Sequence, residues 1–438
     1  MLIGSILRVL ILFIGAYNLA VPDYKWASPY MLVHGVFVDN ALVIACVGWM
    51  MATGEVRRLA STSTARSCAL LLCGLAVWGV AATFSNHMRP TDYGQALRHA
   101  YFAVWLSLAV HWTIRFGPLV VLRPFLWGAL AGAIINIYFT VTDPWQLVLG
   151  VPTLRSQNGA GGFLGLCIGL AAWLMAVRRK RSDLWLAVNV LLVCLVTTAL
   201  SFSKTALVIG GCGLLGWLSL YFRSLLSPRT GWIALGLLTG GVIVGGILRE
   251  RAAETVVAVR RTIEIKFTDL DFNSRYSLGA RYQYFVGVGE VVREHPLFGV
   301  GYSGFYDAIT QTHTYARGVM ADEDPEAGAQ GVSNPHNSFL FYASANGIPG
   351  LLLATSLFFL VVFRMIGAYP ASPVLRFLMC CIAAAYFVYG MTLPTLLNTP
   401  VMFVAAGIAC GSRGWLNDVT GSKAVQATPS PLAPSPAV

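Results

Sequence analysis

Long apolar runs separated by short polar connections occupy most of the chain. A helix needs about 20 apolar residues to cross the hydrocarbon core of a bilayer. Runs of that length predict about 12 transmembrane helices, and hence an all-α polytopic membrane protein. We place them at Leu2–Val21, Tyr30–Met51, Cys68–Ser85, Ala96–Phe116, Leu119–Thr140, Ala160–Val177, Leu184–Phe202, Ala206–Phe222, Trp232–Leu248, Ser338–Phe363, Pro373–Leu393 and Thr395–Cys410.

The composition agrees with a lipid environment. Of the 438 residues 56% are hydrophobic and only 11% are charged, whereas a soluble domain carries about 25% charged residues. The net charge of +11 raises nucleic acid as a partner, but the cations of the short loops gather on one side of the predicted topology. By the positive-inside rule that side is cytoplasmic. The charge therefore reflects topology, and we predict no nucleic-acid binding.

The pattern divides the chain into four parts. Residues 1–248 hold predicted transmembrane helices 1–9, and residues 338–411 hold helices 10–12. Between them, residues 249–337 form a polar stretch too long for a simple connector, with helix-like apolar spacing. We expect one large, mainly helical periplasmic loop domain there. Residues 412–438 end in a Pro- and Ser-rich sequence and are predicted to be a disordered cytoplasmic tail.

Two polar groups stand where predicted helices begin. Arg155 and Asn158 precede the helix at Ala160–Val177, where a cation, an amide and a helix N-terminus suit an anionic group. Ser203 and Lys204 lie in a Ser-rich turn and offer a hydroxyl and a positive charge. Each group has a simpler alternative: an interfacial Arg with a helix cap in the first, and a Lys that snorkels to the membrane surface in the second.

Two further groups belong to the long polar stretch. Arg281 and Tyr282 precede the string Gly299–Gly304, which matches GxGxxG but has no βαβ unit around it. We interpret these glycines as a sharp backbone turn under a helix. His336 and Asn337 stand where the chain returns to the membrane. An imidazole with a pKa of about 6.5 can accept a proton from a sugar hydroxyl, although a helix-capping cluster is the alternative.

The topology places these four groups on one membrane face. Three cations, Arg155, Lys204 and Arg281, and one base, His336, make a site for a diphosphate and a nucleophilic hydroxyl. No carboxylate pair of the DxD kind on that face calls for a metal, so we predict neither a metal nor another cofactor. The histidines within predicted helices, such as His99, are interpreted as hydrogen-bonded core residues.

The order of these groups resembles the O-antigen ligase and polymerase superfamily of bacterial membrane glycan transferases, which includes lipopolysaccharide O-antigen ligases, repeat-unit polymerases and protein O-oligosaccharyltransferases. The similarity runs from about Leu154 to Leu353. The matching parts are Arg155 with Asn158, the Ser-rich turn with Lys204, Arg281-Tyr282 leading to His295-Pro296-Leu297-Phe298-Gly299-Val300-Gly301, and His336-Asn337-Ser338-Phe339-Leu340 followed by Asn346-Gly347-Ile348-Pro349-Gly350.

The resemblance implies roles for single residues. Arg281 would bind the donor diphosphate and His336 would be the general base, so both are candidate catalytic residues. Arg155, Asn158, Ser203, Lys204, Tyr282 and Asn337 are candidate substrate-binding residues. Many members carry Arg at the Ser-rich turn, and Lys204 in its place weakens bidentate phosphate recognition.

The resemblance also implies the reaction: metal-independent, inverting transfer of a glycan from undecaprenyl diphosphate to an acceptor hydroxyl at the periplasmic face of the bacterial inner membrane. The acceptor would be lipid A–core in a ligase, a second lipid-linked repeat unit in a polymerase, or Ser or Thr in a protein transferase. We expect a ligase, with a polymerase as the alternative. The small external domain disfavours a protein transferase.

A transporter or flippase of lipid-linked glycan is the competing class, because about twelve helices suit it. Asp39 is the clear carboxylate in the middle of a predicted helix, whereas a proton relay normally needs several ionisable groups within the membrane. A transporter also has no need of a cationic, His-bearing domain confined to one face. The sequence therefore favours the enzyme.

Overall fold

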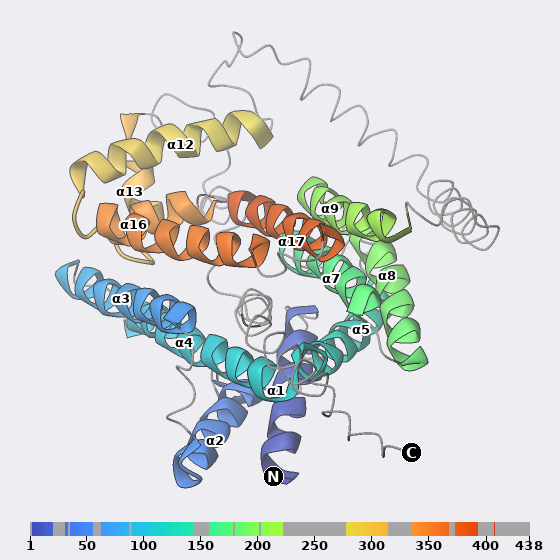
Figure 1. Ribbon diagram of the computed structural model, residues 1–438. Coiled ribbons are helices and arrows are strands. Elements are labelled where there is room, and N and C mark those ends of the chain that lie inside the picture. Colours follow the sequence, from blue (N-terminus) through green and yellow to red (C-terminus); the bar gives the residue numbers. More distant parts are fainter. Residues whose placement is uncertain are drawn as a thin grey trace, which may run out of the picture.

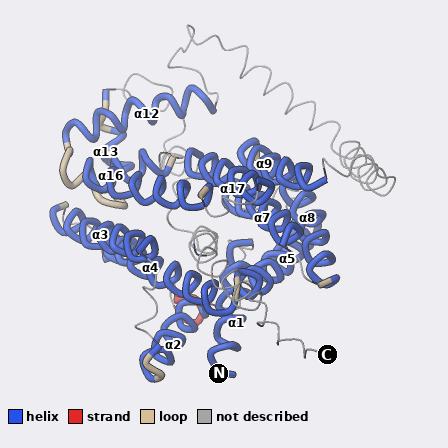
Figure 2. The backbone as a smooth tube through the Cα atoms, in the orientation of Figure 1, coloured by secondary structure: helices blue, strands red, loops and turns tan. Residues whose placement is uncertain are grey.

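The computed structural model describes residues 2–20, 31–33, 36–55, 63–86, 90–142, 157–177, 180–200, 203–221, 277–313, 335, 337–367, 373–392 and 407. These parts are almost entirely helical (Figures 1 and 2). The elements are α1 (Leu2–Ala20), β1 (Met31–Val33), β2 (Val36–Phe37), α2 (Val38–Ala52), α3 (Ser63–Ser85), α4 (Pro90–Phe116), α5 (Pro118–Thr142), α7 (Gln157–Val177), α8 (Arg181–Leu200), α9 (Lys204–Tyr221), α12 (Ser277–Glu294), α13 (Phe305–Thr310), α16 (Ser338–Ile366) and α17 (Pro373–Thr392).

Most predicted transmembrane segments coincide with a helix. Seven described helices, α1, α3, α5, α7, α8, α16 and α17, are long and apolar enough to cross a membrane. The chain is therefore a multi-pass membrane protein. The predicted spans Trp232–Leu248 and Thr395–Cys410 lie outside the described residues, apart from Gly407, so the total of twelve stays a prediction.

The predicted span Tyr30–Met51 is wrong in its first part. Met31 pairs with Phe37 and Val33 with Val36 in a short antiparallel hairpin, and only then does α2 begin. The apolar run contains β-branched valines and a glycine, which suit a hairpin as well as they suit a helix. Asp39 is therefore the second residue of α2 and not its middle, at the helix end where a carboxylate is favoured by the helix dipole.

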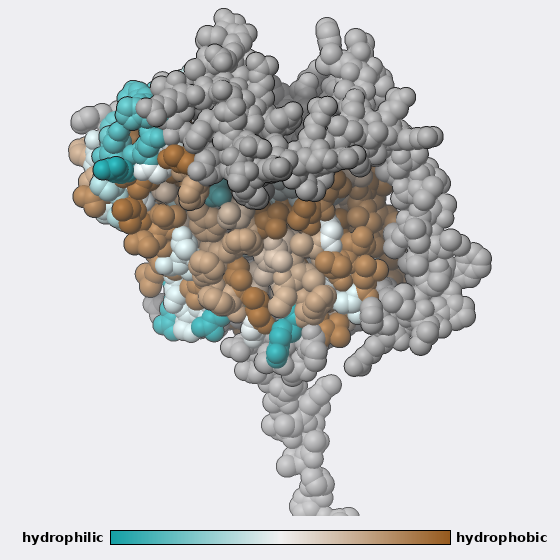
Figure 3. Space-filling view, turned by 90° about the horizontal axis from the view of Figure 1, so that it is seen from above, coloured by the Kyte–Doolittle hydropathy of each residue, from teal (hydrophilic) through white to brown (hydrophobic). Residues whose placement is uncertain are grey.

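Helix α7 is the centre of the bundle. It contacts α1, α5, α8, α9 and α17, and nearly all of its side chains are buried, including Trp173. By contrast, large apolar side chains on the outer helices are exposed: Leu70 and Val77 on α3 and Phe363 on α16 have exposed fractions of about 70%. The described part of the face seen in Figure 3 is largely apolar, with hydrophilic residues at its margins. Such a surface requires lipid around it.

An ion pair joins α5 to α8. Arg123 of α5 binds Asp183 of α8 through two parallel hydrogen bonds, Nε to Oδ1 at 2.7 Å and Nη2 to Oδ2 at 2.8 Å. The Asp183 carboxylate is only 2% exposed and also accepts the backbone N–H of Lys180 at 3.2 Å. A buried carboxylate satisfied in this way stabilises the fold mainly because removal of its partner would leave it uncompensated.

We therefore expect Arg123→Gln to lower the free energy of unfolding by about 3 kcal/mol, the usual cost of breaking a buried ion pair. Thermal unfolding of the detergent-purified protein measures it. Arg115→Gln is the matched control, because Arg115 pairs with Glu55 where about a third of each side chain is exposed. A drop in melting temperature as small as that of the control would contradict the role given to Arg123.

Candidate functional site

A kink in α16 creates the contact on which the candidate site is built. Gly347 has φ 66° and ψ −167°, which breaks α16 into two helical pieces. The N–H of Ile348 turns away and donates to the carbonyl of Pro296 at 2.8 Å, and Pro349 has no N–H at all. The carbonyls of Ser344 and Ala345 thereby lose their normal helical donors.

The glycine-rich turn after α12 supplies the missing donors. Val300 N–H donates to Ser344 at 2.8 Å, and Gly301 N–H donates to Ala345 at 2.9 Å. Gly299 and Gly301 reach this position with φ of 62° and 78°, a conformation that favours glycine. The motifs His295–Gly301 and Asn346–Gly350 of the sequence therefore meet in one contact. The prediction that these glycines form a sharp turn under a helix is confirmed, and the turn links α12 to α13.

Side chains from α3 secure this contact. Trp78 donates from Nε1 to the carbonyl of Asn346 at 2.9 Å and stacks on Phe298, with ring centroids 5.1 Å apart. Asn86 donates from Nδ2 to the carbonyl of Gly299 at 3.2 Å. Asn346 itself donates from Nδ2 to the Tyr302 hydroxyl at 2.9 Å. Burial raises the pKa of Tyr302 to about 12, so the phenol keeps its proton at neutral pH and remains a neutral partner.

Helix α4 adds a second layer of buried polar contacts. Ser303 donates to Oδ2 of the fully buried Asp92 at 2.5 Å. His99 Nδ1 lies 3.0 Å from the carbonyl of Ala96, which can only accept, so Nδ1 carries the proton. Nε2 is then an acceptor for the Tyr342 hydroxyl at 2.7 Å. The interpretation of His99 as a hydrogen-bonded core residue is confirmed.

Asn337 fixes the start of α16. Its backbone is extended, and its side-chain oxygen accepts the N–H groups of Phe339 at 2.8 Å and Leu340 at 3.1 Å, as an N-cap does. Its Nδ2 donates to the carbonyl of Met391 in α17 at 3.4 Å. Asn337 therefore has a structural task, and its proposed contact with substrate stays a prediction. His336, the residue before it, lies outside the described residues.

The register of α7 against α9 brings two predicted groups to one end of the bundle. Gly165 lies against Gly210, and Gly169 lies against Gly213. Both residue numbers increase together, so the two helices run in parallel and begin side by side. Asn158 is the second residue of α7, and Lys204 is the first residue of α9.

Helix α17 brings the start of α16 to the same end. Gly162 of α7 lies against Tyr389, and Gly169 lies against Ile382, so α17 runs antiparallel to α7 and ends beside its beginning. The Met391 carbonyl that Asn337 contacts belongs to this end of α17. Three helix N-termini, those of α7, α9 and α16, therefore lie at one end of the bundle. The partial positive charge of a helix N-terminus favours an anionic ligand.

Helix α12 approaches the same region. It packs on α16 through Tyr284, Val288 and Val291, in a cluster that includes Ala343 and Leu340 (Figure 1). Both helices run toward the contact made by the glycine-rich turn and the kink. At 1.5 Å per residue, Arg281 lies about 20 Å back along α12 from the turn, and the start of α16 lies about 14 Å back from the kink. The backbone of Arg281 and the start of α16 therefore lie at the same end of the pair.

The predicted site residues are described to different extents. Ser203 is buried, and its hydroxyl accepts the Ala206 N–H at 3.2 Å, which makes it the N-cap of α9. Only backbone positions are described for Asn158, Lys204, Arg281 and Tyr282, and Arg155 lies outside the described residues, as His336 does. Their catalytic and substrate-binding roles stay predictions.

The sequence pattern did not reveal the residues that support the kink. Trp78, Asp92 and Tyr302 form essential contacts, yet each is an ordinary residue type for its segment. The usable signal was Pro349: a proline after an Asn-Gly pair inside an apolar run leaves helix carbonyls without donors, and these require partners from elsewhere.

We expect Gly299→Ala to lower the free energy of unfolding by about 2–3 kcal/mol, because a Cβ would be held at positive φ and pressed against the Ser344 carbonyl. Thermal unfolding in detergent measures the loss. Gly289→Ala on α12 is the control, since a Cβ there meets open space. Equal melting temperatures for the two variants would contradict the importance of the turn.

For Asn337 we expect the N-cap to account for about 1 kcal/mol of stability. Asn337→Ala should lose it, whereas Asn337→Ser and Asn337→Asp should retain it, as read by thermal unfolding. A substrate contact predicts in addition that the Ser variant is stable but less active than wild type. Full activity of that variant would leave the cap as the sole role of Asn337.

Comparison with known proteins agrees with this arrangement. The family model of the O-antigen ligases matches residues 189–355, which include α9, α12, α13 and the kink in α16. No curated protein matches the chain. Because the matched segment contains the glycine-rich turn, the His336-Asn337 pair and the Asn346–Gly350 motif, it confirms the resemblance that these motifs predict. Residues 189–355 are thus similar to the O-antigen ligase family, which relates this part of the chain to the superfamily of O-antigen ligases and polymerases.

Proposed function

We propose that this protein transfers a glycan from undecaprenyl diphosphate to an acceptor hydroxyl at the periplasmic face of the bacterial inner membrane. The family match supports glycosyl transfer of the O-antigen ligase and polymerase type in general. The observation that carries the more specific proposal is the grouping of the α7, α9 and α16 N-termini at one end of the bundle. Asn158 and Lys204 belong to the first turns of α7 and α9, and His336 precedes the N-cap of α16 in the sequence.

The proposed donor site uses charge. Arg281, Lys204 and Arg155 contribute cations, and the helix N-termini add partial positive charge. Together they would stabilise the additional negative charge that develops on the leaving diphosphate as the bond between the anomeric carbon and its oxygen breaks. Such preorganised contacts act on the transition state, and losing one typically slows the reaction by about 10²–10³-fold.

The proposed acceptor site uses His336 as general base. Its imidazole takes the proton of the acceptor hydroxyl while that oxygen bonds to the anomeric carbon from the face opposite the leaving diphosphate, which inverts the configuration. In the sequence, His336 stands between the buried Pro335 and Asn337, the N-cap of α16. Lipid A–core is the proposed acceptor, which makes the protein a ligase, and a second lipid-linked repeat unit would make it a polymerase.

The test is complementation of a deletion strain with His336→Ala and Arg281→Ala, with surface glycan read on a gel at equal membrane expression. We expect each variant to lose at least about 10²-fold in activity. His313→Ala and Arg293→Ala are matched controls and should retain activity. Both side chains are exposed; Arg293 lies on α12, as Arg281 does, and His313 follows α13.

The products identify the acceptor. Loss of capped lipopolysaccharide with accumulation of long lipid-linked polymer supports the ligase, and accumulation of single lipid-linked repeats supports the polymerase. Accumulation of the lipid-linked glycan on the cytoplasmic side would instead indicate a transporter. Unchanged glycan in both variants would show that His336 and Arg281 are not the catalytic pair.

A further inference from the structure

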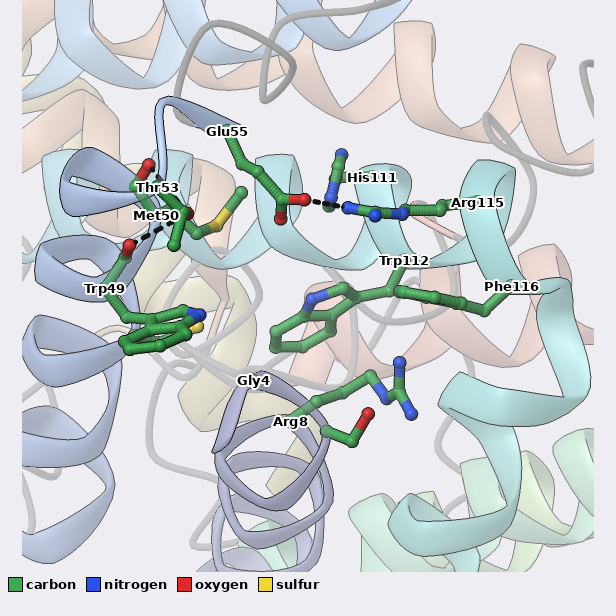
Figure 4. A pocket seen from close by; sticks show the side chains of 12 residues that line it. Gly4, Arg8, Trp49, Met50, Thr53, Glu55, His111, Trp112, Arg115 and Phe116 are labelled. Carbon is green, nitrogen blue, oxygen red and sulfur yellow. Dashed lines mark hydrogen bonds and ion pairs between the residues drawn. The ribbon is translucent and has the colours of Figure 1, made fainter. Parts of the chain in front are cut away.

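A cavity with charged side chains in its wall lies where α1, α2 and α4 meet, within the N-terminal part of the chain that the family model does not cover (Figure 4). Its volume is about 130 Å³, room for roughly four waters at about 30 Å³ each. Its walls combine aromatic rings with charged groups, and the charged groups come from α1, α4 and the turn after α2. The residues that line it include Arg8 of α1, Trp49 and Glu55 of α2 and the turn after it, and His111, Trp112, Arg115 and Phe116 of α4.

The cavity is remote from the candidate glycan site. Arg115 lies near the C-terminal end of α4, whereas Asp92, which binds Ser303 of the glycine-rich segment, lies near its N-terminal end. At 1.5 Å per residue these two positions are about 35 Å apart, close to the full thickness of a bilayer. The cavity therefore opens at the other end of the bundle, where the short-loop cations of the sequence lie.

Its charge balance calls for an anion. The Arg115 guanidinium forms an ion pair with the Glu55 carboxylate, as the dashed line in Figure 4 marks. Arg8 has no such partner within the described part of the chain. Its side chain is 9% exposed, its guanidinium carbon lies 4.5 Å from the centre of the Phe116 ring, and its buried Nε has no hydrogen-bond partner among the described residues.

A buried guanidinium N–H without an acceptor is costly, because it loses water and gains no hydrogen bond in return, and this holds for the Nε–H of Arg8. Stacking on Phe116 covers one face of the guanidinium and leaves its edge of N–H donors available. Phosphate oxygens match that edge in geometry and charge. Trp49 and Trp112 line the same cavity (Figure 4), and their rings would shield such a contact from water.

The surroundings of the cavity favour a lipid as the source of the phosphate. On α1, the apolar residues Leu2, Ile3 and Ile6 are 75%, 52% and 49% exposed, next to the lining residues Gly4, Ser5 and Arg8. Met51, which follows the lining residue Met50 on α2, is 62% exposed. Acyl chains would cover these side chains while the headgroup enters the cavity beside Arg8. Basic pockets between membrane helices bind anionic headgroups in this way.

We propose that the cavity binds the phosphate headgroup of an anionic membrane phospholipid, with Arg8 as its principal ligand. Arg115 is a second cation, whose charge is partly neutralised by its ion pair with Glu55. This site is independent of the proposed glycan transfer. Occupancy would satisfy Arg8 and tie α1, α2 and α4 together.

The test is a titration of the full-length protein in detergent with phosphatidylglycerol, read by native mass spectrometry. We expect Arg8→Gln to weaken binding about tenfold, and Glu55→Gln to strengthen it, because the change frees Arg115 and removes a negative charge. Arg66→Gln, which removes an exposed cation from the start of α3, is the matched control and should bind as wild type does. A variant that merely misfolds cannot bind more tightly, so Glu55→Gln separates binding from stability.

Ligand controls separate the sources of the phosphate. Diacylglycerol with the same acyl chains should not bind, since it lacks the phosphate. Inorganic phosphate should displace phosphatidylglycerol only at far higher concentration, and displacement at equal concentration would overturn the assignment to a lipid. Equal losses in Arg8→Gln and Arg66→Gln, or weaker binding by Glu55→Gln, would overturn the site itself.

Discussion

The exchange of hydrogen bonds at the kink of α16 is the interaction on which the rest of the site depends. Pro349 cannot donate and the N–H of Ile348 is directed elsewhere, so two helix carbonyls need donors from another part of the chain. Val300 and Gly301 provide them. Ser344 and Ala345 are buried, so water cannot substitute for these donors and the contact is required. It joins the end of α12 to the middle of α16 and so sets how both helices approach the site.

Polar side chains around the kink extend this constraint to the N-terminal helices. Trp78 of α3, Asn86 directly after α3, and Asp92 and His99 of α4 bind the turn or α16 directly. The family match begins at residue 189, yet these four residues lie well before it. The matched domain therefore depends for its shape on helices that the family model does not include.

The sequence predicted the features that follow from local chemistry. Apolar run length placed the described spanning helices, and the glycines at 299 and 301 correctly indicated a sharp turn. The hairpin before α2 was not predicted, because a run of valines fits either structure and hydropathy does not distinguish them. The partners of the kink were also not predicted. Trp78 and Asn346 are 268 residues apart, and only the packing of α3 against α16 brings them together.

The ion pair between Arg123 and Asp183 helps to fix the position of α8 along the bilayer normal. An apolar helix meets similar lipid wherever it slides along the bilayer normal, so hydrophobicity alone fixes its vertical position loosely. The two parallel hydrogen bonds of this pair fix the start of α8 against α5. Because α8 is a continuous rod of 20 residues, its far end is held at a defined height as well. Ser203 and Lys204 come soon after that end in the sequence. The ion pair at the start of α8 therefore helps to set the height of Ser203 and Lys204 at the opposite end of the bundle.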